Sequence, residues 1–432
     1  MNYQESLEYL EELNTFGVKL GLSRIERLAE LLGHPERKYY TIHITGTNGK
    51  GSVSCMTAGI LTASGLRTGL YTSPHLFSYT ERCKVDGKEI SEEEFASCLT
   101  RVREAAEKMV QEGEETPTQF EVLTALAFLW FAEQKVDYAV IEVGLGGLLD
   151  STNIITPVLS VITNVTLEHA DRCGGTLEGV AQHKAGIIKE GVPVITGAEG
   201  IPLQIIEKVS EEKDAELMVL GRDFTGSFER FSDGFQELVF SSGKFEVRSL
   251  HYELALLGDY QIANSALAVM AAVWLSKTEK AITPMALQTA LKKAVWPGRF
   301  EDMSIGKQHI RVDGAHNPAG IKALRASLDR YYPDMPRVFL LGILADKAID
   351  EMLPALLRKE DVLVATLPDS PRAAAPELLV EKADVRHAEA EQDNEKALNR
   401  ALELADENSL IVCAGSLYLI GGLRQMLLQK EH

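Results

Sequence analysis

The sequence has few cysteines and no long hydrophobic run. Its 432 residues contain five cysteines, at Cys55, Cys83, Cys98, Cys173 and Cys413. They are scattered and form no CxxC pair, so we expect neither a disulfide framework nor a zinc site, and a reducing cytoplasm is the simplest location. The longest apolar run, VLTALAFLWFA from Val122, is too short to span a bilayer, so no membrane partner is expected.

Positive charge is scarce as well. There are 44 Lys and Arg residues against 63 Asp and Glu residues, which gives a formal net charge of −19. This balance argues against nucleic-acid binding, which requires a cationic surface, but it allows a local basic pocket for a small anion. Near the N-terminus, Leu7, Leu10 and Leu13 recur at helical spacing among acidic residues, which predicts an amphipathic helix and not a signal peptide.

What the sequence does contain is a regular alternation of β-branched runs with helical stretches. The predicted strands cover residues 39–45, 67–72, 137–143, 158–165 and 192–196, and a long predicted helix covers 119–133. Such alternation predicts right-handed βαβ units and a mostly parallel sheet. Between Gly226 and His251, turn residues separate short runs, which predicts antiparallel hairpins added to that first sheet.

A Trp-Pro-Gly break at Trp296–Gly298 marks the predicted domain boundary and the expected hinge. After it the strand–helix rhythm restarts in the runs HIRVDG, RVFLLGIL, DVLVATLP and SLIVCAG. We therefore expect an α/β protein with two domains. The first, residues 1–296, is a P-loop-type domain with a mostly parallel sheet and a small antiparallel add-on. The second, residues 297–432, is a Rossmann-like domain.

A glycine-rich loop with the sequence GTNGKGS follows the first predicted strand and precedes a helix. In that position backbone N–H groups and the positive end of the helix dipole face an anion, lysine adds a point charge, and a following serine can ligate Mg²⁺. The common spacing GxxxxGK[ST] is absent, because position 44 is Ile44 and Gly51 separates Lys50 from Ser52. The alternative is a simple turn with an incidental lysine. The context favours a triphosphate site.

GTNGKGS resembles the ATP loop of the Mur ligases and of the folylpolyglutamate synthases, which share a fold. The segments TSPHL, EVGLGG followed by DSTN, ITNVTLEHAD and GTLEGVAQHKAGIIKEGVPV resemble the folylpolyglutamate/dihydrofolate synthase family in particular, and the resemblance spans essentially the whole chain. It implies an ATP-dependent ligase that is a monomer. The ATP-binding residues that it implies are Thr47, Asn48, Gly49, Lys50, Gly51, Ser52, Asn264, Arg299 and Asp313.

The resemblance also implies two Mg²⁺ ions, and a monovalent cation such as K⁺ is a further candidate. The implied ligands are Ser73, Glu142, His169, Lys184 and Ser52, with Lys184 carbamylated so that it becomes an anion. Magnesium prefers hard oxygen ligands, and a lysine accepts CO₂ only as the neutral amine. From the residues alone, the alternatives are a solvated strand-end carboxylate for Glu142, a loop histidine for His169 and a surface helix lysine for Lys184. Two departures, His183 and Leu148, stand where relatives often carry Glu and Arg.

For the second substrate, the resemblance places Phe120, Asp150 and Arg82 at a folate or pterin site. Phe120 would stack on the pterin ring, and Asp150 would accept hydrogen bonds from its amino and ring N–H groups. Phe120 is alternatively an ordinary core aromatic, and Asp150 a cap of the turn after its strand.

In the C-terminal domain the segment VDGAHNP carries Asp313 and His316, and a turn made by Gly, Asn and Pro is the alternative for it. The resemblance makes His316, with Lys50 and Lys184, a catalytic residue near the transferred phosphoryl group. ATP is expected between the two domains, whose closure would assemble the site.

The expected reaction is ATP-dependent addition of L-glutamate to the γ-carboxylate of (tetrahydro)folate through an acyl phosphate. Dihydropteroate is a second expected acceptor, which would make the enzyme a dihydrofolate synthase as well. Three alternatives remain at this point: a monofunctional folylpolyglutamate synthase, a Mur-type peptide ligase and a nucleotide-regulated binding protein without turnover. The partners expected in each ligase case are small molecules, with no nucleic acid.

Overall fold

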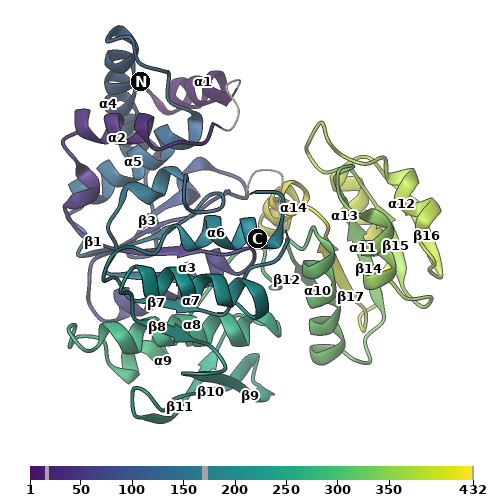
Figure 1. Cartoon of the computed structure of the whole chain (residues 1–432). Helices are drawn as coiled ribbons and strands as arrows, with labels where there is room; N and C mark the ends of the chain where they lie inside the picture. The colour runs from purple at the N-terminus through teal and green to yellow at the C-terminus, as the bar shows by residue number, and fades with distance from the viewer. Residues whose placement is uncertain (15–18, 168–173, 431–432) are drawn as a thin grey trace. The chain divides into compact units, whose positions relative to one another are not determined.

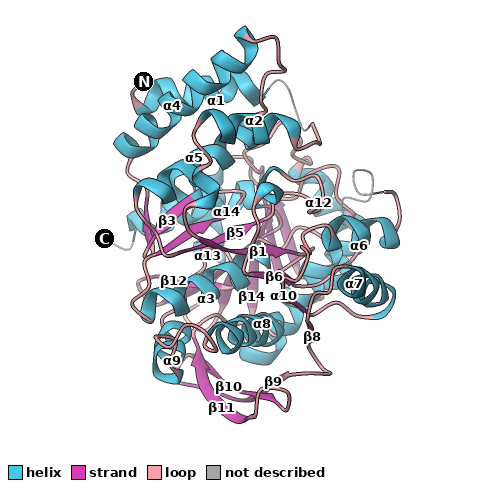
Figure 2. Cartoon of the chain, turned by 60° about the vertical axis from the view of Figure 1, so that its left-hand side comes forward, coloured by secondary structure: helices cyan, strands magenta, loops and turns pink. Residues whose placement is uncertain are grey.

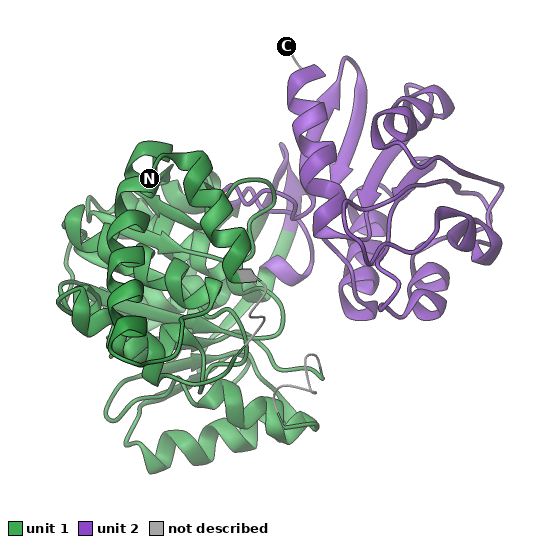
Figure 3. Ribbon diagram, turned by 90° about the horizontal axis from the view of Figure 1, so that it is seen from above, with its two compact units in different colours: residues 1–229, 237–253, 262–294 green, residues 230–236, 254–261, 295–432 purple. Residues whose placement is uncertain are grey.

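The computed structural model describes residues 1–14, 19–167 and 174–430. The chain divides into two compact units (Figure 3). Unit 1 comprises residues 1–229, 237–253 and 262–294, and unit 2 comprises residues 230–236, 254–261 and 295–432. Two short segments from the first 296 residues therefore group with the C-terminal part of the chain. No helix in the described ranges is both long enough and apolar enough to cross a membrane.

Unit 1 is built on an eight-stranded sheet with the strand order β4-β3-β2-β5-β1-β6-β7-β8 (Figure 1). The strands are β1 Tyr40–Thr45, β2 Thr68–Tyr71, β3 Cys83–Val85, β4 Lys88–Glu89, β5 Tyr138–Glu142, β6 Leu159–Ile162, β7 Val194–Thr196 and β8 Leu217–Val219. From β2 to β8 the neighbours pair in parallel, and only β3 and β4 at one edge are antiparallel. The predicted mostly parallel sheet is confirmed.

Helices lie on both faces of this sheet (Figure 2). The helices before residue 294 are α1 Tyr3–Asn14, α2 Ser23–Leu31, α3 Lys50–Ala63, α4 Glu92–Gln111, α5 Gln119–Glu133, α6 Leu177–Ala185, α7 Gly200–Glu212, α8 Tyr260–Leu275 and α9 Pro284–Lys292, with 3-10 turns η1 Pro35–Arg37, η2 Tyr79–Arg82 and η3 Ser151–Ile154. Of these, α1 and α2 pack on α4 and α5. Every residue of β5 is buried, as expected for a central parallel strand covered on both faces. The helix predicted at 119–133 has those bounds.

The hairpins predicted between Gly226 and His251 form three strands, β9 Thr225–Ser232, β10 Phe235–Ser242 and β11 Val247–Leu254. Their connections are short, which makes the pairing antiparallel. Within the described residues they form a sheet of their own, with the order β11-β10-β9, and do not extend the edge of the first sheet. The predicted antiparallel add-on is therefore present as a separate small sheet.

Unit 2 contains a six-stranded sheet with the order β12-β13-β17-β14-β15-β16, in which only the β12–β13 pair is antiparallel. Its elements are β12 Glu301–Ile305, β13 Gln308–Val312, α10 Pro318–Tyr331, β14 Arg337–Leu341, α11 Ile349–Leu356, β15 Val362–Ala365, α12 Pro376–Lys382, β16 His387–Ala390, α13 Asn394–Leu404, β17 Leu410–Ala414 and α14 Leu417–Lys430. The predicted alternation of parallel strands and helices in the C-terminal part is confirmed.

One buried ion pair joins α2 to the start of α5. Thr118 and Glu121 form a capping box at that start, and the Glu121 carboxylate accepts the backbone N–H of Thr118 at 2.6 Å. The same carboxylate, which is 1% exposed, accepts Nε of Arg24 on α2 at 3.1 Å from each oxygen. Glu121 thus both caps α5 and ties it to α2.

We predict that Glu121→Ala lowers the free energy of unfolding by about 2–4 kcal/mol, because it removes a helix cap and leaves Arg24 without its buried partner. Glu107→Ala, in the exposed pair with Arg103, is the control and should cost less than about 0.5 kcal/mol. Urea unfolding followed by tryptophan fluorescence measures both. Equal, small losses would mean that the buried pair contributes no more than a surface pair.

Candidate functional site

The predicted phosphate loop joins β1 to α3 and has glycine where the backbone leaves no room for a side chain. Gly46 and Gly49 have φ angles of +154° and +83°. A Cβ at Gly46 would collide with Oγ1 of Thr163, and one at Gly49 would collide with the amide of Asn264 on α8. The loop is therefore pressed against both neighbours, and the predicted nucleotide residue Asn264 lies directly beside it.

The loop is held in shape by the segment that follows β6. Backbone N–H of Thr47 donates to the carbonyl oxygen of Asn164, and N–H of Asn48 donates to Oδ1 of the same residue, both at 2.9 Å. Thr163 donates its hydroxyl to the carbonyl of Asn48 at 2.6 Å. Sequence reasoning assigned no role to Thr163 or Asn164, although both lie in ITNVT at the carboxyl end of a predicted strand, where open α/β sheets bind ligands.

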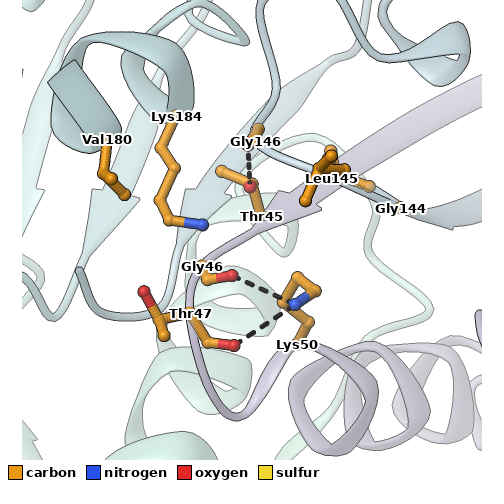
Figure 4. A pocket seen from close by; sticks show the side chains of 10 residues that line it. Thr45, Gly46, Thr47, Lys50, Gly144, Leu145, Gly146, Val180 and Lys184 are labelled. Atoms are coloured by element: carbon orange, nitrogen blue, oxygen red, sulfur yellow. Dashed lines mark hydrogen bonds between the residues drawn. The ribbon is translucent and has the colours of Figure 1, made fainter. Parts of the chain in front are cut away.

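A small pocket opens between the phosphate loop, the residues after β5 and helix α6 (Figure 4). Its lining residues are Thr45, Gly46, Thr47, Lys50, Val143, Gly144, Leu145, Gly146, Val180 and Lys184. The Lys50 ammonium donates to the carbonyl oxygens of Gly46 and Thr47 at 3.1 and 3.3 Å. The predicted residues Thr47, Lys50 and Lys184 are thus brought together, and two amines from different helices line one pocket, which favours an anionic ligand.

The opposite wall is the turn after β5, residues 144–150, which we call the glycine turn. Thr45, the last residue of β1, donates its hydroxyl to the carbonyl of Gly146 at 2.7 Å. On the other side, N–H of Leu148 donates to the carbonyl of His183 at 2.8 Å. A Cβ at Gly147 would lie 2.7 Å from that carbonyl oxygen, so the turn passes α6 too closely for any residue but glycine.

Two of the predicted metal ligands meet at the ends of β5 and β2. The Glu142 carboxylate, 4% exposed, accepts the backbone N–H of Ser73 at 3.0 Å. Ser52 is buried in the first turn of α3. In the part of the chain that the structure describes, no group of three His, Cys, Asp or Glu side chains converges, and His169 lies outside the described residues. Mg²⁺ is commonly held by one or two carboxylates plus substrate phosphates, so this donor set fits it.

Phe120, from the predicted pterin site, contacts the glycine turn, and Asp150, from the same predicted site, is the last residue of that turn. A Cβ at Gly144 would collide with the ring of Phe120, so the two are in contact. Asp150 accepts N–H of Leu145 at 2.8 Å and N–H of Thr152 at 3.0 Å, and it caps η3. The alternative prediction for Asp150, that it caps the turn after its strand, is therefore confirmed. Burial raises the pKa of Asp150, while these hydrogen bonds lower it.

Arg82, the third predicted pterin residue, is oriented by two aromatic rings at the start of β3. Its Nε donates to Nδ1 of His75 at 2.9 Å, and its guanidinium carbon lies 5.4 Å from the ring centre of Tyr79. Burial and the neighbouring Arg82 charge lower the pKa of His75 to about 4, so the ring is neutral and can accept this bond at neutral pH. The carbonyl of Arg82 accepts N–H of Thr72, next to Ser73.

Within unit 2, three predicted residues gather around Gly314 at the end of β13. A Cβ at Gly314 would collide with Nη1 of Arg299, and Nδ1 of His316 lies 2.7 Å from the Gly314 carbonyl. Asp313 accepts N–H of Phe300 at 2.7 Å and the hydroxyl of Tyr260 at 3.2 Å. Burial raises the pKa of Asp313, and the Arg299 charge lowers it. Tyr260 was not predicted, although it lies in GDYQIAN beside Asn264.

Comparison with known proteins gives the same family for both parts of the chain. The model of the Mur ligase middle domain matches residues 44–272, and that of the Mur ligase glutamate ligase domain matches residues 298–417. The first match alone covers more than half of the chain.

Individual relatives agree over nearly their whole length. Folylpolyglutamate synthase of Lacticaseibacillus casei is 36% identical, with 99% of each chain covered. Dihydrofolate synthase/folylpolyglutamate synthase of Bacillus subtilis is 33% identical, with 98% of this chain and 99% of the relative covered. The structure of Mycobacterium tuberculosis folylpolyglutamate synthase complexed with ADP superposes with a TM-score of 0.87 at 31% identity, covering 99% of both chains. The chain therefore belongs to the folylpolyglutamate/dihydrofolate synthase branch of the Mur ligase family.

Proposed function

We propose that the chain is an ATP-dependent ligase that adds L-glutamate to the γ-carboxylate of (tetrahydro)folate and also joins L-glutamate to dihydropteroate. One observation carries the proposal: the glycine turn lines the pocket that holds Lys50 and Lys184, contacts Phe120 and includes Asp150. A phosphate in the pocket and an aromatic acceptor against Phe120 would therefore share one wall. A shared wall would bring an acceptor carboxylate next to a terminal phosphate.

The first half-reaction needs a nucleotide held by its phosphates. Backbone N–H groups at the start of α3 and the Lys50 ammonium would neutralise phosphate charge, and Thr47, Asn48, Gly49, Gly51 and Ser52 would line the loop around it. Asn264, Arg299 and Asp313 would contact the nucleotide, because Arg299 offers the planar fork that suits a phosphate. The relative with bound ADP supports ATP as this nucleotide.

The proposed chemistry proceeds in two steps. A carboxylate oxygen of the acceptor attacks the γ-phosphorus of ATP, the bond to the β-phosphate oxygen breaks, and ADP leaves. The α-amine of glutamate then attacks the carbonyl carbon of the acyl phosphate and loses a proton. The tetrahedral intermediate collapses with loss of phosphate, and the amide remains. The protein contributes mainly positioning and charge neutralisation, with His316 proposed near the transferred phosphoryl group.

Glu142, Ser73, Ser52, His169 and carbamylated Lys184 are the proposed ligands of two Mg²⁺ ions, and K⁺ is a further candidate. When bound, the ions would supply positive charge against the phosphates. A carbamate on Lys184 would also remove a like-charge repulsion, because an unmodified lysine would face Lys50 across the same pocket.

The domain roles and cellular setting are proposals of the same kind. We propose an ATP-binding domain over residues 1–296, a glutamate ligase domain over 297–432 and a hinge at Trp296–Gly298. These limits enclose the two matched family domains at 44–272 and 298–417. Among the described residues, Cys83, Cys98 and Cys413 form no disulfide, which suits a reducing cytoplasm, and we propose that the enzyme acts there as a monomer.

A monofunctional folylpolyglutamate synthase is the second candidate, because the L. casei relative carries that name alone, whereas the B. subtilis relative is named for both activities. Both candidate functions would use the residues discussed above, and they differ only in whether dihydropteroate is accepted as a substrate.

We predict ADP release with L-glutamate, ATP and Mg²⁺ when either dihydropteroate or tetrahydrofolate is the acceptor, and a product heavier by one glutamyl residue in each case. Lys50→Ala should lower this release at least about 100-fold, because the phosphates lose their point charge. Lys208→Ala, an exposed lysine on α7, is the matched control and should leave the rate unchanged.

Coupled ADP detection and mass spectrometry provide the measurement, and circular dichroism verifies folding. Turnover with tetrahydrofolate alone would favour the monofunctional candidate. Turnover only with a UDP-muramoyl peptide would contradict the folate assignment, and an unchanged rate in Lys50→Ala would remove the phosphate-loop argument.

We predict that Lys184→Ala lowers kcat at least about 100-fold and that a small added carboxylate restores part of the loss, since it replaces the oxygen ligands of the carbamate. The measurement is kcat against acetate concentration, with chloride at equal ionic strength as the control. Mass spectrometry of the native protein in bicarbonate tests for added CO₂. Full activity of Lys184→Ala would show that the carbamate has no role.

A further inference from the structure

His43 is a polar residue at the centre of the buried sheet. It lies in β1 between Ile42 and Ile44, opposite Ile141 of β5 and Ser160 of β6, and it is 0% exposed. Nε2 lies 2.9 Å from Oγ1 of Thr152 in η3, whereas Nδ1 has no hydrogen-bond partner among the described residues. A buried nitrogen without a hydrogen bond costs free energy, and an apolar side chain at position 43 would avoid that cost. The histidine therefore needs a role that compensates for it.

The direction of the hydrogen bonds follows from the groups present. The Thr152 hydroxyl donates to Oδ1 of Asp150 at 2.5 Å, and the same oxygen accepts the backbone N–H of Thr152 at 3.0 Å, so it acts as an acceptor. The threonine hydroxyl has one hydrogen, which goes to Asp150, so the hydroxyl must accept from His43. His43 is therefore the neutral tautomer with hydrogen on Nε2. Burial, and to a smaller extent the Lys189 charge, lowers the pKa of His43 to about 3, which agrees with a neutral ring.

This chain of bonds ends on the glycine turn. Asp150 accepts N–H of Leu145, and Leu145 follows Gly144, the residue that contacts Phe120. Thr45, two residues after His43 and so on the same side of β1, holds Gly146. Strand β1 therefore fastens the turn at two points. The His43 point acts on the Asp150 carboxylate and on Leu145 and Gly144 beside Phe120, and the Thr45 point acts on Gly146. Gly144, Leu145 and Gly146 all line the phosphate pocket as well.

We infer that His43 is a positioning residue for the acceptor substrate: through Thr152 it fixes the Asp150 carboxylate and the backbone of Gly144 and Leu145, against which a pterin-type ring system binds. This inference rests on the proposed function and adds to it a residue that contacts no substrate. Loss of the His43 bond should weaken recognition of the acceptor more than that of the nucleotide, because it releases the Asp150 carboxylate. Loss of the Thr45 bond should act mainly on the nucleotide, because Thr45 itself lines the phosphate pocket.

The test compares His43→Leu and Thr152→Val with Thr45→Val, and KM for ATP and for tetrahydrofolate is measured in each. We expect His43→Leu and Thr152→Val to raise KM for tetrahydrofolate about tenfold and to change KM for ATP less than about twofold, since one hydrogen bond of about 1.4 kcal/mol is lost. Thr45→Val should give the reverse pattern. Thr152→Ser retains the hydroxyl and should recover the wild-type KM for tetrahydrofolate, which a purely steric role would not predict.

A second readout needs no turnover. In protein labelled with ¹⁵N-histidine, the His43 ring should show hydrogen on Nε2 and none on Nδ1, and Thr152→Val should shift the Nε2 resonance. The inference would be overturned by equal changes in both KM values, by no change in either, or by hydrogen on Nδ1. The tautomer is measured on the wild-type protein, so this result stands even if one variant fails to fold. A wild-type chain without turnover on any acceptor, but with the expected tautomer, would instead locate the failure in the proposed function.

Discussion

The site depends on how closely the glycine turn, residues 144–150, passes its neighbours. It contacts Phe120 at Gly144, accepts the Thr45 hydroxyl at Gly146, and approaches the His183 carbonyl at Gly147. Side chains at Gly144 or Gly147 would push the turn away from α5 or α6. Because the turn is held from three sides, Lys184, the phosphate loop and the predicted acceptor residue Phe120 all lie around it.

Each of the two units buries charged side chains, and each compensates their charge locally. Asp150 and Asp313, which are 5% and 4% exposed, each accept backbone N–H groups and one hydroxyl. Glu142 accepts the N–H of Ser73, and Lys50 donates to carbonyls of its own loop. Carboxylates satisfied in this way keep a fixed orientation at little reorganisation cost, which is what a site for a highly charged nucleotide requires.

Much of this could be predicted from the sequence, because the patterns concerned are local. Strand–helix alternation indicated both sheets, and GTNGKGS between a strand and a helix indicated the loop that the structure has there. The short edge strands β3 and β4 and the separation of the β9–β11 sheet were missed, since short polar strands carry little periodic signal and sheet pairing is not local. His43 read as an ordinary strand residue. The inferred role of His43 depends on its hydrogen bond with Thr152, which lies 109 positions away, and no sequence spacing predicts that contact. Asn164 and Tyr260 were missed for the same reason, and the role of His169 stays a prediction.

The central proposal is that the acceptor carboxylate meets the terminal phosphate of ATP at the glycine turn and becomes an acyl phosphate. The most direct test uses tetrahydrofolate whose γ-carboxylate oxygens are ¹⁸O, with ATP, Mg²⁺ and L-glutamate. The account predicts that each phosphate released carries one ¹⁸O atom from the carboxylate, because the attacking oxygen stays with phosphorus when the amide forms. Released phosphate without ¹⁸O, alongside normal amide product, would contradict it.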